Sequence, residues 1–280
     1  MYIYLFIKLF KPHRKRGEIS RFPPRHFSVF VDRKRGKCYN TSITYHRKVL
    51  FQKMRGKCSF ALKLLTFVGA ISGVILSMLR YDLDGYSHPT KRLFYFTGLS
   101  NIWIGLMMLF LLLLPYMGAW GKSEKVKQTS YVIKFVLTVS ITLTALIFCT
   151  VLAPGSAEND YHAWTLSSLL THVFVPLLAI ADFFLDEYKT AIATKHVYYT
   201  VIPPLLYFIF ATILILSGFD FGRGDPYPYF FLHFDSPAGI FGFSRQMPYL
   251  IGTFYWIIIM LGLILGIGFL YRKLYHSKKE

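Results

Sequence analysis

Residues 165–185, TLSSLLTHVFVPLLAIADFFL, decide the fold class of this chain. The stretch has the length that a helix needs to cross the hydrocarbon core of a bilayer, about 20 residues, and it contains one histidine, His172. A histidine at that depth carries a desolvation cost, so it usually faces a protein interior or a wet cavity and needs a partner. His172 is therefore the first candidate functional residue.

Five further apolar runs have a similar length and the same character. The composition agrees with them, since 54% of the chain is hydrophobic and only 16% is charged, against about 25% charged residues in ordinary soluble domains. The sequence thus predicts an all-α polytopic membrane protein with six transmembrane helices and excludes a soluble core. The five other runs are residues 60–79, 93–117, 131–152, 197–218 and 247–271.

The net charge of +18 is concentrated at the N-terminus. Residues 1–58 hold 16 Lys and Arg against two acidic residues, and residues 11–53 show no sustained helical or strand periodicity. Two interpretations stay open: residues 1–53 are a cytoplasmic arm that binds anionic lipid, or the working protein starts at Met54. Nucleic acid is a less favoured partner for such an arm beside a transmembrane helix. Residues 54–280 form the predicted six-helix domain.

The loop charges predict the orientation. With the N-terminus inside, nine Lys and Arg of the loops and tail after residue 58 are cytoplasmic and five are outside, which predicts that both termini are cytoplasmic. The outer loop 219–246 carries nine aromatic residues, including Tyr227 and Tyr229, and we expect it to lie in the membrane interface and to act as a lid.

Two polar stripes lie at membrane depth. Thr97, Ser100 and Asn101 share one face of the second predicted helix, and Ser168, Thr171 and His172 share a face of the fourth. At about 1.5 Å per residue, Thr97 lies about 6 Å and His172 about 10 Å below the outer end of its helix. If the two helices are neighbours, Thr97 and His172 converge in the outer leaflet.

The pair suggests one chemistry and one simpler role. A hydroxyl with a base beside it can act as a nucleophile, with Ser100 or Asn101 donating to the oxyanion. Polar side chains of these types also hydrogen-bond transmembrane helices to one another with no further function. Neither a metal nor an organic cofactor is indicated.

Three charged residues of the runs receive structural interpretations. Lys63 and Lys134 lie near the ends of their runs, where a long side chain can reach the headgroups. Asp182 is interpreted as an interfacial carboxylate, with proton transfer as the alternative.

Several short motifs resemble those of a bacterial family of six-helix integral membrane proteins. That family is distantly similar to the eukaryotic androgen-induced membrane proteins, which are threonine-dependent hydrolases of fatty acid esters of hydroxy fatty acids. The motifs are Tyr95-Phe96-Thr97 with Ser100-Asn101, His172-x-x-x-Pro176 with Asp182, Ile202-Pro203 with Tyr207, and Tyr227-Pro228-Tyr229-Phe230.

The resemblance covers about residues 54–275 and implies Thr97 as nucleophile and His172 as general base. Ser100-Asn101 and the Tyr-Pro-Tyr loop match the bacterial pattern alone. We therefore expect a lipid esterase in a bacterial plasma membrane, with Ser100, Asn101, Tyr227 and Tyr229 binding substrate or oxyanion. A ligand-binding or transport protein and a structural membrane subunit are the alternatives.

Overall fold

The computed structural model describes most of the chain, and its side chains from residue 54 onward. The chain divides into two compact units, residues 1–50 and 51–280, which are described separately. The described residues are 29–32, 37–154, 163–186, 188, 190–222 and 226–277.

The first unit contains a short antiparallel hairpin, β1(Val29–Asp32) and β2(Lys37–Asn40), and α1(Thr41–Leu79) begins directly after it. The sequence shows no sustained periodicity in residues 11–53, yet their described part contains this hairpin and the beginning of α1. Residues 41–53 contain neither glycine nor proline, so nothing in them interrupts a helix that continues into the apolar run. The predicted lipid-binding side chains of the arm, residues 1–53, lie outside the described side chains.

Six helices in the second unit are long and apolar enough to cross a membrane, which confirms the six predicted spans. Apart from the isolated bridge between Phe243 and Ile251, the described secondary structure of this unit is helical. The spans are Met54–Leu79, Phe96–Tyr116, Glu124–Leu152, Leu166–Leu185, Thr194–Leu216 and Thr253–Ser277.

Each span is built from one or more helical elements. Only α1 and α9(Thr253–Ser277) supply a span from a single element, whereas the other four contain 3₁₀ or π turns. Those four comprise α2(Phe96–Leu113) with η2(Leu114–Tyr116), α4(Glu124–Ile147) with η3(Phe148–Leu152), α5(Leu166–Leu169) with η5(Leu170–Phe174) and α6(Val175–Leu185), and α7(Thr194–Tyr198) with η6(Tyr199–Val201) and α8(Ile202–Leu216). The short connecting elements are η1(Pro89–Phe94), α3(Gly118–Lys122) and η7(Phe230–Leu232).

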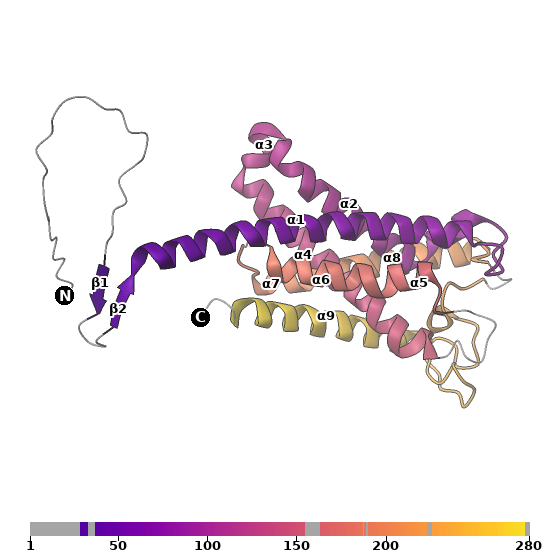
Figure 1. The fold of residues 1–280 in the computed structure, drawn as a ribbon. Helices are drawn as coiled ribbons and strands as arrows, with labels where there is room; N and C mark the ends of the chain where they lie inside the picture. Colours follow the sequence, from indigo (N-terminus) through magenta and orange to yellow (C-terminus); the bar gives the residue numbers. More distant parts are fainter. Residues whose placement is uncertain are drawn as a thin grey trace, which may run out of the picture. The chain divides into compact units, whose positions relative to one another are not determined.

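Helix α4 lies at the centre of the bundle and packs against α2, α6 and α9 (Figure 1). One buried cluster joins α4, α6 and α9 through aromatic rings such as Phe135 and Phe183. A second joins α1, α2, α4 and α6 through smaller side chains, and there Gly105 of α2 approaches Ala70 of α1. Small residues allow this close approach of transmembrane helices. The helices that carry Thr97 and His172 therefore both pack against α4.

The last span begins at Thr253, six residues later than the start of the predicted run. Residues 242–252 instead turn back on themselves, with the Gly252 amide donating to the Gly242 carbonyl at 2.9 Å and the Ser244 amide to the Leu250 carbonyl at 3.0 Å. Pro248 and Gly252 interrupt the helix here, because proline lacks an amide donor and glycine is a weak helix former.

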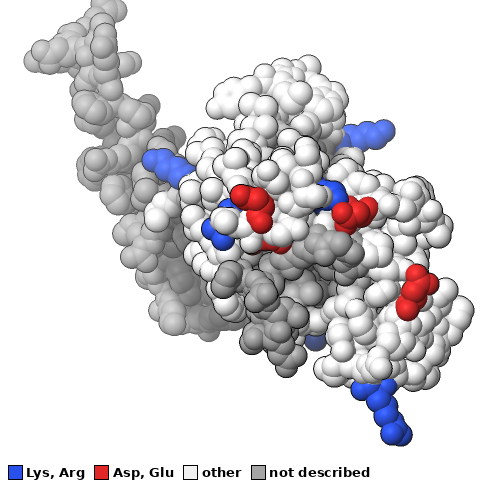
Figure 2. All heavy atoms as spheres, turned by 90° about the vertical axis from the view of Figure 1, so that its right-hand side faces the viewer, with Lys and Arg blue, Asp and Glu red and all other residues white. Residues whose placement is uncertain are grey.

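The end of the bundle formed by the loops after α1 and α8 carries few charged side chains, and several acidic and basic groups on it are adjacent (Figure 2). Lys91 pairs with Asp220 at 2.6 Å, and Arg92 pairs with Asp84. Most of this face is uncharged.

Candidate functional site

The structure brings Thr97 and His172 together. The Thr97 hydroxyl oxygen lies 3.3 Å from His172 Nε2, although 75 residues separate them in the chain. Thr97 comes from the first turn of α2, and His172 from the π turn η5 in the fourth span. The two helices are neighbours, as the depth argument required for the pair to meet.

The ring of His172 is held in one orientation. Its Nδ1 lies 3.0 Å from the Ser168 carbonyl oxygen. Because a carbonyl oxygen can only accept, Nδ1 carries the proton in a neutral ring, and Nε2 is then the unprotonated nitrogen that faces Thr97. The Phe148 ring stacks on the imidazole with centroids 3.9 Å apart. His172 is therefore arranged to accept the Thr97 proton.

Both aromatic partners in this stack lie in π turns, η3 for Phe148 and η5 for His172. Pro176, four residues after His172, has no amide to donate to the His172 carbonyl, so the α-helical ladder is interrupted here. Helix α1 packs directly against η5, since a Cβ added at Gly73 would lie 2.8 Å from Cγ2 of Thr171. Turns of this kind are frequent at functional sites.

Thr97 is fixed by the way α2 begins. Tyr95, which precedes the helix, makes no side-chain cap. A Cβ at Gly98 would lie 2.7 Å from the Arg92 carbonyl oxygen, so only glycine lets η1 pack this closely on the first turn. The first amides of a helix have no partner within it, and they must be satisfied from outside.

Tyr229, from the outer loop, lies against the start of α2, where its ring packs on that of Tyr95 with centroids 5.6 Å apart. Burial raises the pKa of its phenol to about 12, although the neighbouring groups of Thr97 and Phe96 act in the lowering direction. The hydroxyl stays protonated at neutral pH and can itself donate.

Ser100 and Asn101 lie beside the pair, but their hydrogen-bond donors are engaged elsewhere, and the buried Asn101 Oδ1, which can only accept, has no hydrogen-bond partner among the described residues. The Asn101 amide nitrogen donates to the carbonyl oxygens of Thr97 at 2.9 Å and Thr171 at 3.0 Å. The Ser100 hydroxyl lies 3.2 Å from the Thr97 carbonyl and 3.1 Å from the Thr144 hydroxyl. Both side chains join α2 to its neighbours and hold the backbone of Thr97.

Tyr227 is placed apart from Thr97. Its hydroxyl bonds to the carboxylate of Asp235, and its ring packs on His233 with centroids 4.0 Å apart. Of the two tyrosines predicted to bind substrate, the structure thus places only Tyr229 against Thr97.

An apolar groove runs up to Thr97. Its open space is about 760 Å³, including the part that is open to the surroundings. Its walls come from α2, α4, η3, α8, α9 and the loop segment 229–232, and its polar lining residues are Thr97, Thr144, Tyr207 and Tyr229. Tyr207 belongs to one of the motifs quoted from the sequence, although no role was assigned to it. Thr144 is a site residue that the sequence did not single out, and only its place on an apolar helix could have indicated it.

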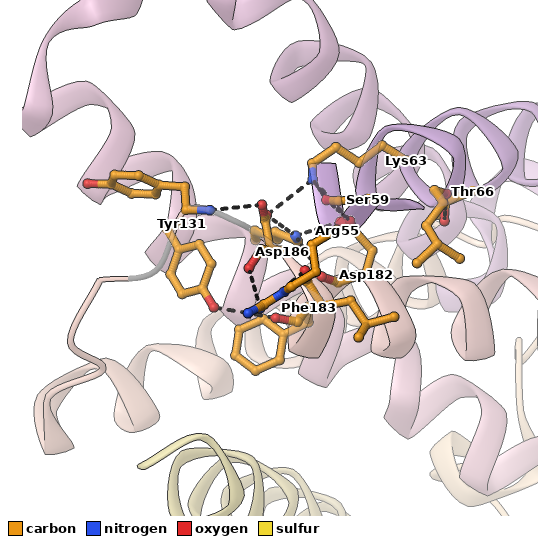
Figure 3. Close-up of polar contacts among 12 residues, drawn as sticks. Arg55, Ser59, Lys63, Thr66, Tyr131, Asp182, Phe183 and Asp186 are labelled. Carbon is orange, nitrogen blue, oxygen red and sulfur yellow. Dashed lines mark hydrogen bonds and ion pairs between the residues drawn. The ribbon is translucent and has the colours of Figure 1, made fainter. Parts of the chain in front are cut away.

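A second polar site lies near the C-terminal end of α6 and holds four buried charges, Lys63, Lys134, Asp182 and Asp186, called here the charge cluster (Figure 3). Lys63 contacts Asp182 at 3.0 Å and Asp186 at 3.2 Å. Lys134 contacts the same two carboxylates at 2.5 Å each.

Neutral and cationic groups complete the charge cluster. The Ser59 hydroxyl donates to Asp182 at 2.7 Å, and the Arg55 guanidinium lies 3.2 Å from the Asp186 carbonyl. In Figure 3 these side chains converge on the end of α6 from α1, while Tyr131 approaches from α4. Within the charge cluster itself the charges balance, two against two, and Arg55 adds a further cation on the backbone carbonyls of the helix end.

The interpretation of Lys134 as a lysine that extends to the headgroups was wrong, because its side chain has no exposed surface and contacts two carboxylates inside the bundle. Asp182 is likewise fully buried and pairs with both lysines. The sequence offers one signal that was missed: opposite charges inside three different apolar runs require partners, because an unpaired buried charge is very costly.

The fold and these two sites define a multi-pass membrane protein of six spans with a hydroxyl–imidazole pair beside an apolar groove. No family model, curated protein or solved structure matches the chain.

Proposed function

We propose that this protein is an intramembrane lipid esterase in which Thr97 is the nucleophile and His172 the general base. The observation that carries the proposal is the contact between the Thr97 hydroxyl and Nε2 of a histidine whose Nδ1 faces a carbonyl. A weak hydroxyl nucleophile needs such an oriented base, and contacts of this kind are often slightly long in the absence of substrate.

The chemistry follows from the geometry. Thr97 Oγ1 attacks the ester carbonyl carbon while its proton moves to His172 Nε2. The imidazolium then protonates the departing alkoxide oxygen as the carbon–oxygen bond breaks, which leaves an acyl ester on Thr97. Water enters next; His172 takes one of its protons, the hydroxide oxygen bonds to the acyl carbon, and Thr97 leaves with the proton returned by His172. The products are an alcohol and a carboxylic acid.

Tyr229 is the donor that this proposal assigns to the oxyanion. Tyr229 lines the groove together with Thr97, and its phenol stays protonated at neutral pH, so it can donate a hydrogen bond there. Asn101 and Ser100, whose hydrogen-bond donors are used between helices, position Thr97 instead. Preorganised donors of this type stabilise charge that develops in the transition state.

The remaining parts of the proposal concern the cell. The resemblance described above points to a bacterial plasma membrane, the loop charges to cytoplasmic termini and the site to the outer leaflet. The basic arm would then contact anionic lipid on the cytoplasmic side.

The experiment is hydrolysis of a panel of fluorogenic acyl esters by the detergent-purified full chain, beside Thr97→Ala and His172→Ala. Turnover by the wild-type protein that both substitutions abolish supports the esterase. All three proteins must show the same thermal unfolding, so that a folding defect is not mistaken for lost chemistry. The absence of turnover in the wild-type protein would overturn the proposal.

The apolar groove favours one alternative, a protein that binds a lipid without breaking a bond. It predicts ligand-dependent thermal stabilisation that persists in Thr97→Ala, with no product formed by either protein.

A further inference from the structure

The groove that ends at Thr97 has a polar end and an apolar end. Thr97 and Tyr229 lie where α2 begins, with Tyr207 next to them, its ring 5.3 Å from that of Phe96. The rest of the lining is almost entirely hydrocarbon and includes Leu143 of α4. A site with polar groups at one end and a long apolar remainder matches an amphiphile whose reactive group meets Thr97.

The long walls of the groove come from two membrane-spanning helices. Helix α8 contributes Leu205 and Phe208, and α9 contributes Ile257, Met260 and Leu261. Leu205 lines the groove and is also 42% exposed on the surface of the bundle. Leu205 lies in the middle of the span Thr194–Leu216, where the exposed surface of a helix faces lipid. The groove beside Leu205 therefore borders hydrocarbon rather than water.

The size of the groove also fits a chain. The groove extends down α9 from Ile257 to Leu261, about 6 Å at the rise of a helix. Apolar side chains bordering a lipid-facing opening neither attract nor satisfy a polar ligand.

We propose that the groove between α8 and α9 binds one acyl chain of a bilayer lipid, which enters sideways from the membrane. The site thereby selects substrates that are dissolved in the bilayer over water-soluble esters. This inference rests on the proposed function for the fate of the bound chain, but the binding itself requires no catalysis.

The experiment measures occupancy directly. The full chain is reconstituted in phosphatidylcholine vesicles containing palmitic acid with a diazirine in its chain, irradiated, and digested, and the labelled peptides are mapped. Leu261→Trp fills the groove, whereas Ile258→Trp adds the same ring on the lipid-facing side of the same helix, where Ile258 is 52% exposed. Thr97→Ala is measured alongside.

We expect labelling of groove-lining residues of α8 and α9 to fall about tenfold in Leu261→Trp, because overfilling a packed site weakens binding by that order. It should be unchanged in Ile258→Trp. Labelling that follows general lipid exposure and is the same in Leu261→Trp and Ile258→Trp would overturn the inference.

The two proposals can fail separately. Ester turnover lost in Thr97→Ala together with equal labelling of both tryptophan variants would keep the esterase and reject lateral chain binding. Groove labelling that is lost in Leu261→Trp, in a protein that hydrolyses no ester, would keep the acyl-chain site and reject the esterase.

Discussion

The two polar sites of this bundle, the charge cluster and the Thr97–His172 pair, differ in how far their polar groups are enclosed by other helices. In the charge cluster each buried lysine contacts two carboxylates, and helices α1, α4 and α6 close around them. The Thr97–His172 pair is neutral, and one of its members borders an open groove. The comparison teaches that polarity within a membrane bundle does not by itself indicate function. Balanced, enclosed charges hold helices together, whereas an oriented pair beside open space can still act on a ligand.

Breaking the charge cluster should have the largest effect on stability. Asp182→Asn removes a carboxylate from two buried ammonium groups, and we expect the free energy of unfolding to fall by about 3–5 kcal/mol. Thr97→Ala, which removes one neutral hydrogen bond, should cost about 1 kcal/mol. Thermal unfolding of both variants in the same detergent measures the difference. Equal losses would remove the distinction between the two sites.

A second substitution tests whether charge balance is the cause. Adding Lys134→Met to Asp182→Asn leaves one lysine and one aspartate, so the charges match again. Most of the lost stability should return, because replacing a buried ion pair by neutral groups is often close to neutral. If the double variant is less stable than Asp182→Asn, the lysine contributes through packing or other contacts rather than through charge.

The next prediction concerns the Thr97–His172 site, from which one hydrogen-bond donor is removed. Tyr229→Phe deletes the hydroxyl assigned to the oxyanion, and turnover should fall about 100-fold while thermal stability changes little. Tyr227→Phe is the matched control, since its hydroxyl bonds to Asp235 from the same loop and it does not line the groove. Equal turnover in the two variants would exclude Tyr229 as the oxyanion donor.

Much of this architecture could be predicted from the sequence, because the length of an apolar run reports directly on membrane spanning. The approach of Thr97 to His172 could be anticipated as a possibility from their similar depth in two helices with the same direction. Which helices are neighbours could not, since lipid-facing and buried faces are equally apolar. That is why the central position of α4 and the groove between α8 and α9 appear only in the structure.

The charged residues show a second limit. A lysine that extends toward the headgroups and one that pairs inside the bundle have the same sequence signature, an apolar run with one cation near its end. Lys134 proved to be buried because Asp182 and Asp186 meet it from another helix. Tyr229 was found through the resemblance of its loop, but its contact with the start of α2 depends on how a long connection folds.

A smaller effect on stability is expected when the close contact between α1 and η5 is disturbed. Gly73→Ala would place a methyl group 2.8 Å from Thr171 and 3.1 Å from Leu170, so α1 or the π turn must shift, at a cost of about 1–3 kcal/mol. Turnover should fall as well, because Thr171 adjoins His172. Gly262→Ala in α9 meets nothing within 4 Å and should be neutral or slightly stabilising. If the two variants behave alike, the close approach of α1 does not determine the geometry of the site.

The smallest expected effect is a pH dependence at the edge of the charge cluster. Burial acts to raise the pKa of Asp186, but the ammonium groups of Lys134 and Lys63 outweigh it and hold that pKa below its ordinary value. The carboxylate therefore contributes stability at pH values above the ordinary carboxyl pKa, near 4, and the contribution is lost as the pH falls further through the lowered pKa. Asp182 and Arg55 face the same helix end, and acid acts on the rest of the chain in both proteins. Only the difference between the wild-type protein and Asp186→Asn therefore reports on Asp186. We expect the unfolding temperature of the wild-type protein to decline more steeply below about pH 4 than that of Asp186→Asn. Parallel curves would mean that Asp186 exerts no net electrostatic effect, and that Asp182 alone anchors the two lysines to α6.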